Sequence, residues 1–330
     1  MGYINGLKKG DKVATREAYG RGLCELGADH DFAVLDADLA EATKTCYFAK
    51  AFPDRFFDCG IAEGNMIGVA AGLAAAGKPV FASSFAMFAA GRAFEQIRNS
   101  VAYPHLNVKI AATHAGITVG EDGATHQCLE DIALMRVLPG MTVISPADAV
   151  EAVAALKAAL EMTGPCYLRF GRYAVPVLHD PDTYRFEIGK GEVLRDGSDV
   201  TIVANGILVS MALTAADTLA AEGIFARVIN IHTVKPLDTE LLCAAAAGTG
   251  AVVTAEEHNI IGGLGSAVAE TLAENCPVPM VRVGVRDSFG RSGKVPELLA
   301  LYGLTPEALC DAARRAVAAK KTGKTERNRV

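Results

Sequence analysis

A glycine-containing loop with acidic and imidazole side chains is the first candidate for chemistry. In the loop GITVGEDGATHQ, Gly120 and Gly123 flank an acidic pair, and the loop follows shortly after His114. The two glycines give the backbone freedom to place Asp122 and His126 over a small polar ligand. Two histidines and one aspartate suit proton transfer to and from hydroxyl groups. A plain turn with a helix-capping threonine is the alternative, and we favour the functional interpretation because loops carry function disproportionately.

Glu63 is the second candidate, at the start of a predicted helix over 62–76 that consists largely of glycine and alanine. Such a helix can approach another backbone very closely. Phe85 and Phe88, three residues apart, follow the next predicted strand. A carboxylate in apolar surroundings beside aromatic rings suggests a planar heterocyclic partner. The residues alone favour the alternative, in which Glu63 complements the helix dipole and the rings are core.

Short apolar runs alternate with helical patterns along the whole chain, which is the signature of parallel sheets covered on both faces. Strands are expected at 32–36, 79–83, 107–113, 141–145, 165–170, 199–204, 225–231, 250–254 and 279–284. Helices are expected at 11–28, 62–76, 89–101, 126–138, 147–161, 207–222, 238–247, 263–274 and 305–319. The length of 330 residues suits two domains. We predict domains at 10–175 and 191–320, a linker at 176–190 and a polar tail at 321–330.

The predicted strands also indicate where a site should lie. In open α/β sheets, ligands bind outside the carboxyl ends of the strands. This rule gathers Asp38, the loop with Phe85 and Phe88, and His114 with the loop after it. Arg172 follows the strand CYLRF and could reach an anionic group there, although an exposed arginine is as often a surface charge.

The composition argues against nucleic-acid and membrane partners. The formal net charge is −6 and the basic residues form no block. The N-terminus lacks an apolar signal region, and the stretch 66–91 is interrupted by Lys78 and Pro79, so no bilayer span is predicted. The eight cysteines are scattered without a C-x-x-C pair, which is typical of reduced cysteines in a cytoplasmic protein.

Common site motifs are missing from the sequence. His114 and His126 stand twelve residues apart without ligand-spaced carboxylates or cysteines, so we predict no metal site in this chain. The GGLG at 262–265 lacks the spacing of a dinucleotide fingerprint and predicts a tight turn. For the neighbouring run Glu256, Glu257 and His258 we expect a solvated or interface turn.

Three segments together resemble the C-terminal portion of transketolase over nearly the whole chain. They are IAEGNMIGVAAGLAAAGKPVFASSFAMF, THAGITVGEDGATHQCLEDIALMRVLPGMTVISPAD and EEHNIIGGLGSAVAE. The pattern G-E-D-G-x-T-H-Q, with a histidine eight positions before its aspartate, is strongly transketolase-like. The resemblance implies two three-layer αβα domains, a thiamine-diphosphate-fold pyrimidine domain followed by a transketolase C-terminal-like domain.

The resemblance also implies thiamine diphosphate as cofactor. Glu63 matches the family glutamate that hydrogen-bonds N1′ of the aminopyrimidine ring and, in an apolar site, can hold a proton for it. Phe88, and behind it Phe85, match aromatic residues that pack on the pyrimidine. Asp38 matches an aspartate near the cofactor, and Glu63 and His126 are the implied catalytic residues.

A sugar site next to the cofactor follows from the same resemblance. His126 and Asp122 match residues that bind hydroxyls near the reacting carbon of a donor ketose. His114, Arg16 and Arg172 match positions that contact the sugar or its phosphate. The implied reaction transfers a two-carbon ketol unit from a ketose to an aldose.

The sequence contains no G-D-G…N segment of the kind that binds Mg²⁺ and the diphosphate in this family. The chain therefore looks like one subunit of a split transketolase. We expect an N-terminal-type partner subunit that holds most of the Mg²⁺ site, a heterotetrameric assembly and sugar-phosphate substrates. We also expect the isolated chain to bind the cofactor poorly.

Two departures from the family pattern concern the substrate and the pyrimidine pocket. Ala42, followed by Thr43, stands where a phosphate-binding serine is usual, and Gly91 stands where an aromatic residue is usual. Whether the substrate is phosphorylated therefore stays open. The alternatives are a 2-oxo acid dehydrogenase β-type or deoxyxylulose-phosphate-synthase-like subunit, a non-catalytic assembly paralogue and a nicotinamide-dependent dehydrogenase.

Overall fold

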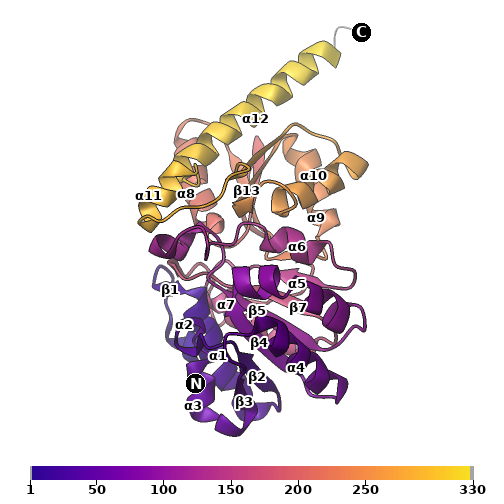
Figure 1. Ribbon diagram of the computed structural model, residues 1–330. Helices are drawn as coiled ribbons and strands as arrows, with labels where there is room; N and C mark the ends of the chain where they lie inside the picture. Colours follow the sequence, from indigo (N-terminus) through magenta and orange to yellow (C-terminus); the bar gives the residue numbers. More distant parts are fainter. Residues whose placement is uncertain (1, 328–330) are drawn as a thin grey trace.

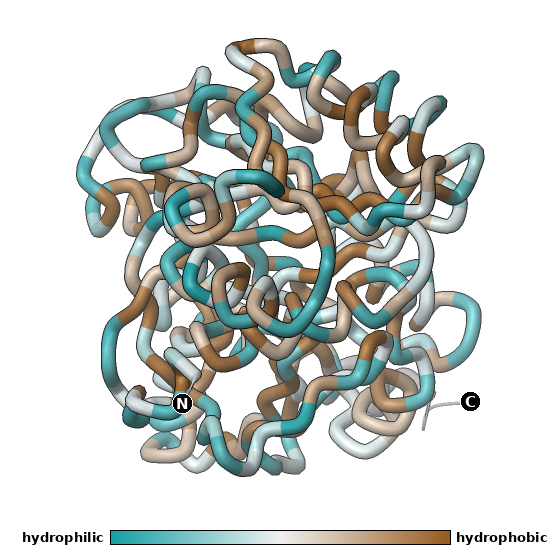
Figure 2. The backbone as a smooth tube through the Cα atoms, turned by 90° about the horizontal axis from the view of Figure 1, so that it is seen from below, coloured by the Kyte–Doolittle hydropathy of each residue, from teal (hydrophilic) through white to brown (hydrophobic). Residues whose placement is uncertain are grey.

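The computed structural model describes residues 2–327 of the chain, with side chains through residue 320. Two layered α/β units follow one another along the molecule, the first in indigo to magenta and the second in orange to yellow (Figure 1). Each has a central sheet between helices, which confirms the expected three-layer αβα fold class. Hydrophobic segments run through the interior, while the peripheral loops are largely hydrophilic (Figure 2).

The first sheet has seven strands in the order β12-β6-β7-β5-β4-β2-β3. They are β2 (Ala33–Asp36), β3 (Phe56–Asp58), β4 (Val80–Phe85), β5 (Val108–Thr113), β6 (Thr142–Ile144), β7 (Cys166–Arg169) and β12 (Thr233–Lys235). All neighbours pair in parallel except β12, which runs antiparallel to β6. A separate two-stranded ribbon joins β1 (Lys12–Ala14) to β8 (Ala174–Pro176).

Helices cover both faces of this sheet. They are α1 (Thr15–Asp29), α2 (Ala40–Thr43), α3 (Cys46–Ala51), α4 (Glu63–Ala75), α5 (Phe94–Gln96), α6 (Asp131–Arg136) and α7 (Ala149–Glu161), with two π-helical segments, η3 (Met87–Arg92) and η4 (Ile97–Ala102), and three 3₁₀ turns, η1 (Tyr3–Gly6), η2 (Pro53–Arg55) and η5 (Ile117–Asp122). Successive strand residues point to opposite faces. In β2, Ala33 and Leu35 therefore join the core with α4, whereas Val34 joins the core with α1 and α7.

The second sheet has five strands in the order β14-β13-β10-β11-β9. They are β9 (Glu192–Arg195), β10 (Val200–Ala204), β11 (Ala226–Asn230), β13 (Val252–Asn259) and β14 (Met280–Val285). Its helices are α8 (Leu208–Ala221), α9 (Thr239–Thr249), α10 (Leu264–Asn275), α11 (Val295–Leu301) and α12 (Pro306–Arg327). Strand β9 is antiparallel to β11, and the other pairs are parallel.

Several expected elements differ from the observed ones. Residues 12–14 form strand β1 instead of the first helical turn, because they pair with β8. The helix expected at 89–101 consists mainly of π-helical turns around the short α5. The helix expected at 126–138 is confined to α6, because Gly116 donates its N–H to the Cys128 carbonyl and holds that segment extended.

The C-terminal half also contains strands that the sequence pattern did not predict. Strand β9 adds an antiparallel edge to the second sheet, and β12 leaves the second unit to pair with β6 of the first. Helix α12 extends to Arg327, beyond the expected end at 319, and takes up much of the expected polar tail. Residues 328–330 of that tail lie outside the described residues. Within residues 2–327, no helix is long and apolar enough to cross a membrane.

Candidate active site

The candidate site lies at the carboxyl edge of the first sheet, where neighbouring parallel strands end together. Phe85 is the last residue of β4 and is paired in register with Thr113, the last residue of β5. His114 comes next in the chain and has a positive φ of 56°. Phe85 and His114 therefore lie side by side, as the strand-end rule predicts.

Four aromatic and imidazole rings meet at this edge. His114 stacks on Phe85 with ring centroids 3.7 Å apart, and Phe88 lies nearly parallel to Phe85 at 5.7 Å. His126, from the glycine-containing loop, meets the Phe88 ring edge-on at 5.3 Å. The cluster brings together residues up to 41 positions apart in sequence, all four of them among the predicted site residues.

His114 is held in its neutral form. Burial, followed by the nearby guanidinium groups of Arg16 and Arg172, lowers the pKa of His114 to about 3. Arg16 Nη1 lies 3.0 Å from His114 Nε2, and because arginine only donates, Nε2 must accept. The proton then resides on Nδ1, which lies 2.9 Å from the Thr113 hydroxyl. In this arrangement His114 is a neutral, oriented acceptor rather than an acid.

Two arginines flank His114 from different parts of the chain. Arg16 also donates to the Ala42 carbonyl at 2.9 Å, so it links α1 to the loop with the unusual alanine. Arg172 donates to the Val119 carbonyl and lies 3.5 Å from the Asp122 carboxylate. The Arg172–Asp122 pair is well exposed, and such pairs contribute little to stability. A substrate group can therefore compete for the Arg172 and Asp122 side chains at little cost.

Glu63 is buried at the first position of α4. Its carboxylate accepts a hydrogen bond of 2.7 Å from Arg92 Nη1. The Arg92 guanidinium carbon also lies 4.6 Å from the centre of the Phe88 ring. The sequence reasoning missed Arg92, although its place four residues after Phe88 in a predicted helix was a usable signal.

Asp38 lies at the same sheet edge, past the end of β2, with an exposed side chain and a φ of 63°. Its backbone N–H donates to Asp58. The buried acid of this loop is Asp36, which sequence reasoning also missed. Asp36 accepts hydroxyl hydrogen bonds from Thr43 and Thr45, and burial raises its pKa to about 6. Asp36 therefore holds the segment 43–45, next to Ala42, which is one of the two departures from the family pattern.

Gln127 attaches the loop with Asp122 and His126 to the second unit. Its side-chain amide nitrogen lies within hydrogen-bonding distance of three carbonyl oxygens, those of Ile117, Gly120 and Arg291, at 3.0 to 3.2 Å. A Cβ at Gly290 would collide with the Gln127 side-chain oxygen, so this contact requires glycine. The position of the loop therefore depends on the second unit.

A buried ion pair of the first unit lies at the junction between the units, close to this loop. Arg169 on β7 makes a two-pronged contact with Asp131 on α6, at 2.7 and 3.2 Å, and also donates to the Glu257 carbonyl on β13. The Tyr167 hydroxyl donates to the same carboxylate. The pair joins β7, α6 and β13 at one point.

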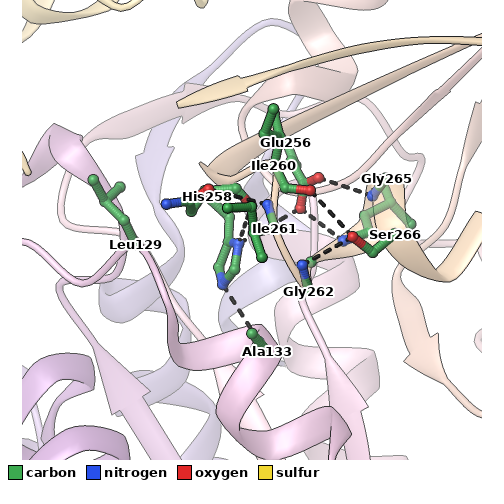
Figure 3. Close-up of polar contacts among 12 residues, drawn as sticks. Leu129, Ala133, Glu256, His258, Ile260, Ile261, Gly262, Gly265 and Ser266 are labelled. Carbon is green, nitrogen blue, oxygen red and sulfur yellow. Dashed lines mark hydrogen bonds and ion pairs between the residues drawn. The ribbon is translucent and has the colours of Figure 1, made fainter. Parts of the chain in front are cut away.

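The run 256–258 lies within strand β13 and is buried at this junction, so the expectation of a solvated or interface turn is wrong. Glu256 accepts hydrogen bonds from the backbone N–H groups of Leu264 and Gly265 at the start of α10. Figure 3 shows Glu256 facing Gly265. Burial raises the pKa of Glu256 to about 7 and lowers the pKa of His258 to about 4. His258 accepts from the Ala133 N–H on α6. The turn predicted at 262–265 lies earlier than expected, because it covers 260–263 and α10 begins at Leu264.

A second polar cluster lies on the far side of the junction. Among the described residues, Glu151, His179 and Glu192 form a group whose ligand atoms are close enough to suit a metal ion. Both ring nitrogens of His179, however, lie 3.0 Å from carboxylates, those of Asp148 and Glu192. Although burial opposes protonation, these carboxylates raise the pKa of His179 to about 10. Both nitrogens then carry protons, and the cluster is an ion-pair network.

A cavity of about 650 Å³ opens next to the ring cluster and is lined by both units. Phe88 and Arg92 line it from η3, and Phe289 lines it from the loop after β14 with 87% of its surface exposed. Behind this lining, Arg92 pairs with the buried Glu63, and a planar nitrogen heterocycle fits the group formed by Glu63 and Phe88. Glu63 supplies a buried acceptor and Phe88 an aromatic face, and the planar guanidinium of Arg92 already uses both.

Comparison with known proteins agrees with these features. The family model "Transketolase, pyrimidine binding domain" matches residues 11–177, and "Transketolase, C-terminal domain" matches residues 189–309. A protein of Methanocaldococcus jannaschii described as "Putative transketolase C-terminal section" is 51% identical over 93% of this chain and 96% of its own length. The 6-deoxy-6-sulfo-D-fructose transketolase subunit SqwH of a Clostridium species is 50% identical over 86% of this chain and 88% of its own length.

A solved structure is similar over the same region. It is described as "Split gene transketolase, inactive beta4 tetramer", and it shares 58% identity and a TM-score of 0.88 over 93% of this chain and 99% of its own. Sequence and structure thus agree on the order of the two domains. This chain belongs to the transketolase family, of which it carries the pyrimidine-binding and C-terminal domains.

Proposed function

We propose that this chain is the pyrimidine-domain subunit of a thiamine-diphosphate-dependent transketolase, active with an N-terminal-type partner subunit. The observation that carries the proposal is Glu63, a buried carboxylate at a helix start whose hydrogen-bond partner, Arg92, lies over the face of Phe88. The cofactor, when bound, supplies the carbanion chemistry that moves a two-carbon ketol unit from a ketose to an aldose. The aminopyrimidine would take the Glu63 carboxylate as its N1′ partner.

The remaining candidate residues orient the sugar. Neutral His114 accepts from Arg16 and so fixes that guanidinium at the sheet edge, where its remaining N–H groups can meet the sugar. His126 stands edge-on to Phe88 with its Nδ1 2.9 Å from the Thr125 hydroxyl. Because Thr125 occupies Nδ1, the Nε2 atom of His126 is available for a donor hydroxyl. Asp122 can accept hydrogen bonds from further hydroxyls, and Arg172 can bind a hydroxyl or a phosphate, because their mutual ion pair is exposed and weak.

The proposal includes the assembly. The similar chain of the inactive β4 tetramer comes from a split-gene transketolase, and the M. jannaschii relative is described as a C-terminal section. By analogy, this chain would pair with an N-terminal subunit that holds Mg²⁺ and the diphosphate, in a heterotetramer. The SqwH relative acts on a sulfonated sugar according to its name, so a phosphorylated substrate and another anionic sugar are both compatible with the two arginines.

The test is reconstitution with a candidate N-terminal subunit and an assay of ketol transfer from several ketose phosphates. We expect Glu63→Gln to lower kcat by roughly 10²- to 10⁴-fold, the range typical of positioned acid–base groups. Glu95→Gln is the matched control, since Glu95 is a carboxylate in the short helix that follows η3 and bonds only to its near neighbours Gln96 and Asn99. Full activity of Glu63→Gln, or turnover by the isolated chain with thiamine diphosphate and Mg²⁺, would contradict the proposal. Activity with pyruvate instead of a ketose would favour the 2-oxo acid dehydrogenase alternative.

A further inference from the structure

Arg92 makes two contacts that together define the candidate pyrimidine slot. Its Nη1 donates to Glu63 at 2.7 Å, and its guanidinium carbon lies 4.6 Å from the centre of the Phe88 ring. The Glu63 side chain is 1% exposed, whereas the Arg92 side chain is 52% exposed. One end of the ion pair is therefore fixed in the core, and the other end reaches in from the surface.

The Arg92 guanidinium resembles a protonated aminopyrimidine in the properties by which Glu63 and Phe88 would bind a ligand. Both groups are planar, both present N–H donors to a carboxylate, and both stack on an aromatic face. A ring bound to Glu63 and lying on Phe88 would compete with Arg92 for the same carboxylate and the same aromatic face. The two occupants exclude each other.

We propose that Arg92 is a gate residue that fills the pyrimidine slot in the chain without cofactor and must swing away when the aminopyrimidine enters. The inference rests on the proposed function, since it takes thiamine diphosphate as the ligand of Glu63. It goes beyond that function, because it assigns Arg92 the role of an internal competitor that lowers the affinity of the unpartnered chain for its cofactor.

The surroundings of Arg92 allow this movement. The cavity of about 650 Å³ borders Arg92 and offers space for the displaced side chain. The family usually has an aromatic residue at the position of Gly91. Here the flexible Met87 side chain lies beside Gly91 instead, and its terminal carbon occupies the place that a Cβ at residue 91 would need. Partly exposed ion pairs and cation–π contacts are individually weak, so a ligand can displace them.

The test measures binding of 4-amino-5-hydroxymethyl-2-methylpyrimidine, the neutral half of the cofactor, to the purified full chain by ligand-observed NMR titration. This probe lacks the diphosphate, so loss of a positive charge does not itself change its attraction to the protein. We expect Arg92→Met to bind the probe about three- to tenfold more tightly than the wild type, as expected for the loss of weak competing contacts.

Two further variants keep the outcomes distinct. Arg98→Met removes an exposed arginine of the neighbouring turn, whose hydrogen bond goes to Asn99, and should leave the affinity unchanged. Glu63→Gln should weaken binding in both the wild-type and Arg92→Met backgrounds. Thermal midpoints of all variants confirm that each is folded.

The results separate the gate from the function. If Glu63→Gln weakens binding while Arg92→Met binds like the wild type or more weakly, the gate is refuted and the proposed function stands. If Glu63→Gln changes nothing while the probe binds, the assignment of Glu63 in the proposed function fails. If the probe binds no variant, removal of Arg92 has not opened the slot, and the gate is refuted. If Arg98→Met tightens probe binding as much as Arg92→Met does, the gate is also refuted. The tighter binding would then follow from the change in net charge and not from the position of Arg92.

Discussion

The buried ion pair between Arg169 and Asp131 gives the sharpest stability prediction for this chain. Asp131 is fully buried and accepts hydrogen bonds from Arg169 Nε at 2.7 Å, Arg169 Nη2 at 3.2 Å and the Tyr167 hydroxyl at 2.8 Å. Although burial opposes its ionisation, the Arg169 guanidinium holds the pKa of Asp131 below its usual range. Asp131→Asn would leave the buried arginine without its counter-charge.

The expected cost is large because both charges lie out of water. Removing one partner of a buried pair costs about 3–5 kcal/mol. With an m-value of about 3 kcal/mol per molar urea, the unfolding midpoint should fall by at least about 1 M. The chain has no tryptophan, so tyrosine fluorescence and far-UV circular dichroism are the appropriate probes of urea unfolding.

The pair Arg136–Glu270 provides a matched control. It starts from the same helix, α6, and has an N–O distance of 2.7 Å, but it reaches Glu270 on α10 of the second unit, whose side chain is 64% exposed. Glu270→Gln should therefore cost no more than about 1 kcal/mol. Replacing both charges, as Asp131→Leu with Arg169→Met, should recover much of the loss, because it removes the uncompensated charge.

A clear outcome would refute this reasoning. If Asp131→Asn lowers the midpoint no more than Glu270→Gln does, the Arg169–Asp131 pair is not the buried contact described above.

Two further predictions concern the loop and the junction. Gln127→Glu replaces a side-chain donor that faces three carbonyl oxygens with an acceptor. Because a misplaced loop impairs substrate positioning, we expect a lower thermal midpoint and a roughly tenfold higher KM for the donor ketose in the reconstituted enzyme. Unchanged values of both would contradict the linking role of Gln127. Because Asp148 and Glu192 raise the pKa of His179 from 6.5 to about 10, its stabilisation should be complete below about pH 6.5 and be lost as pH rises through about 10. The thermal midpoint difference between wild type and His179→Asn should accordingly shrink over this range, and a difference that grows with pH would contradict the ion-pair assignment.

The sequence alone was enough for the fold class and for the composition of the ring cluster. Alternating apolar strands and helices predict parallel sheets, because local periodicity reports which faces are buried. The strand pattern also predicts that Phe85 and His114 lie together, since they follow neighbouring strands and parallel strands end at one edge. The GEDGATHQ segment likewise indicated the family, which the comparisons then confirmed.

Tertiary structure decided how these residues are charged and connected. Arg92 reaches Glu63 from a segment wound as π-helical turns instead of the expected α-helix, a local choice that periodicity does not encode. The neutrality of His114 depends on Arg16, which is 98 residues away in the chain. Gln127 donates a hydrogen bond to the carbonyl of Arg291 in the other domain, 164 residues away in the chain. Charge states and such long-range contacts depend on burial and on which segments meet, and these are properties of the assembled fold rather than of any stretch of sequence.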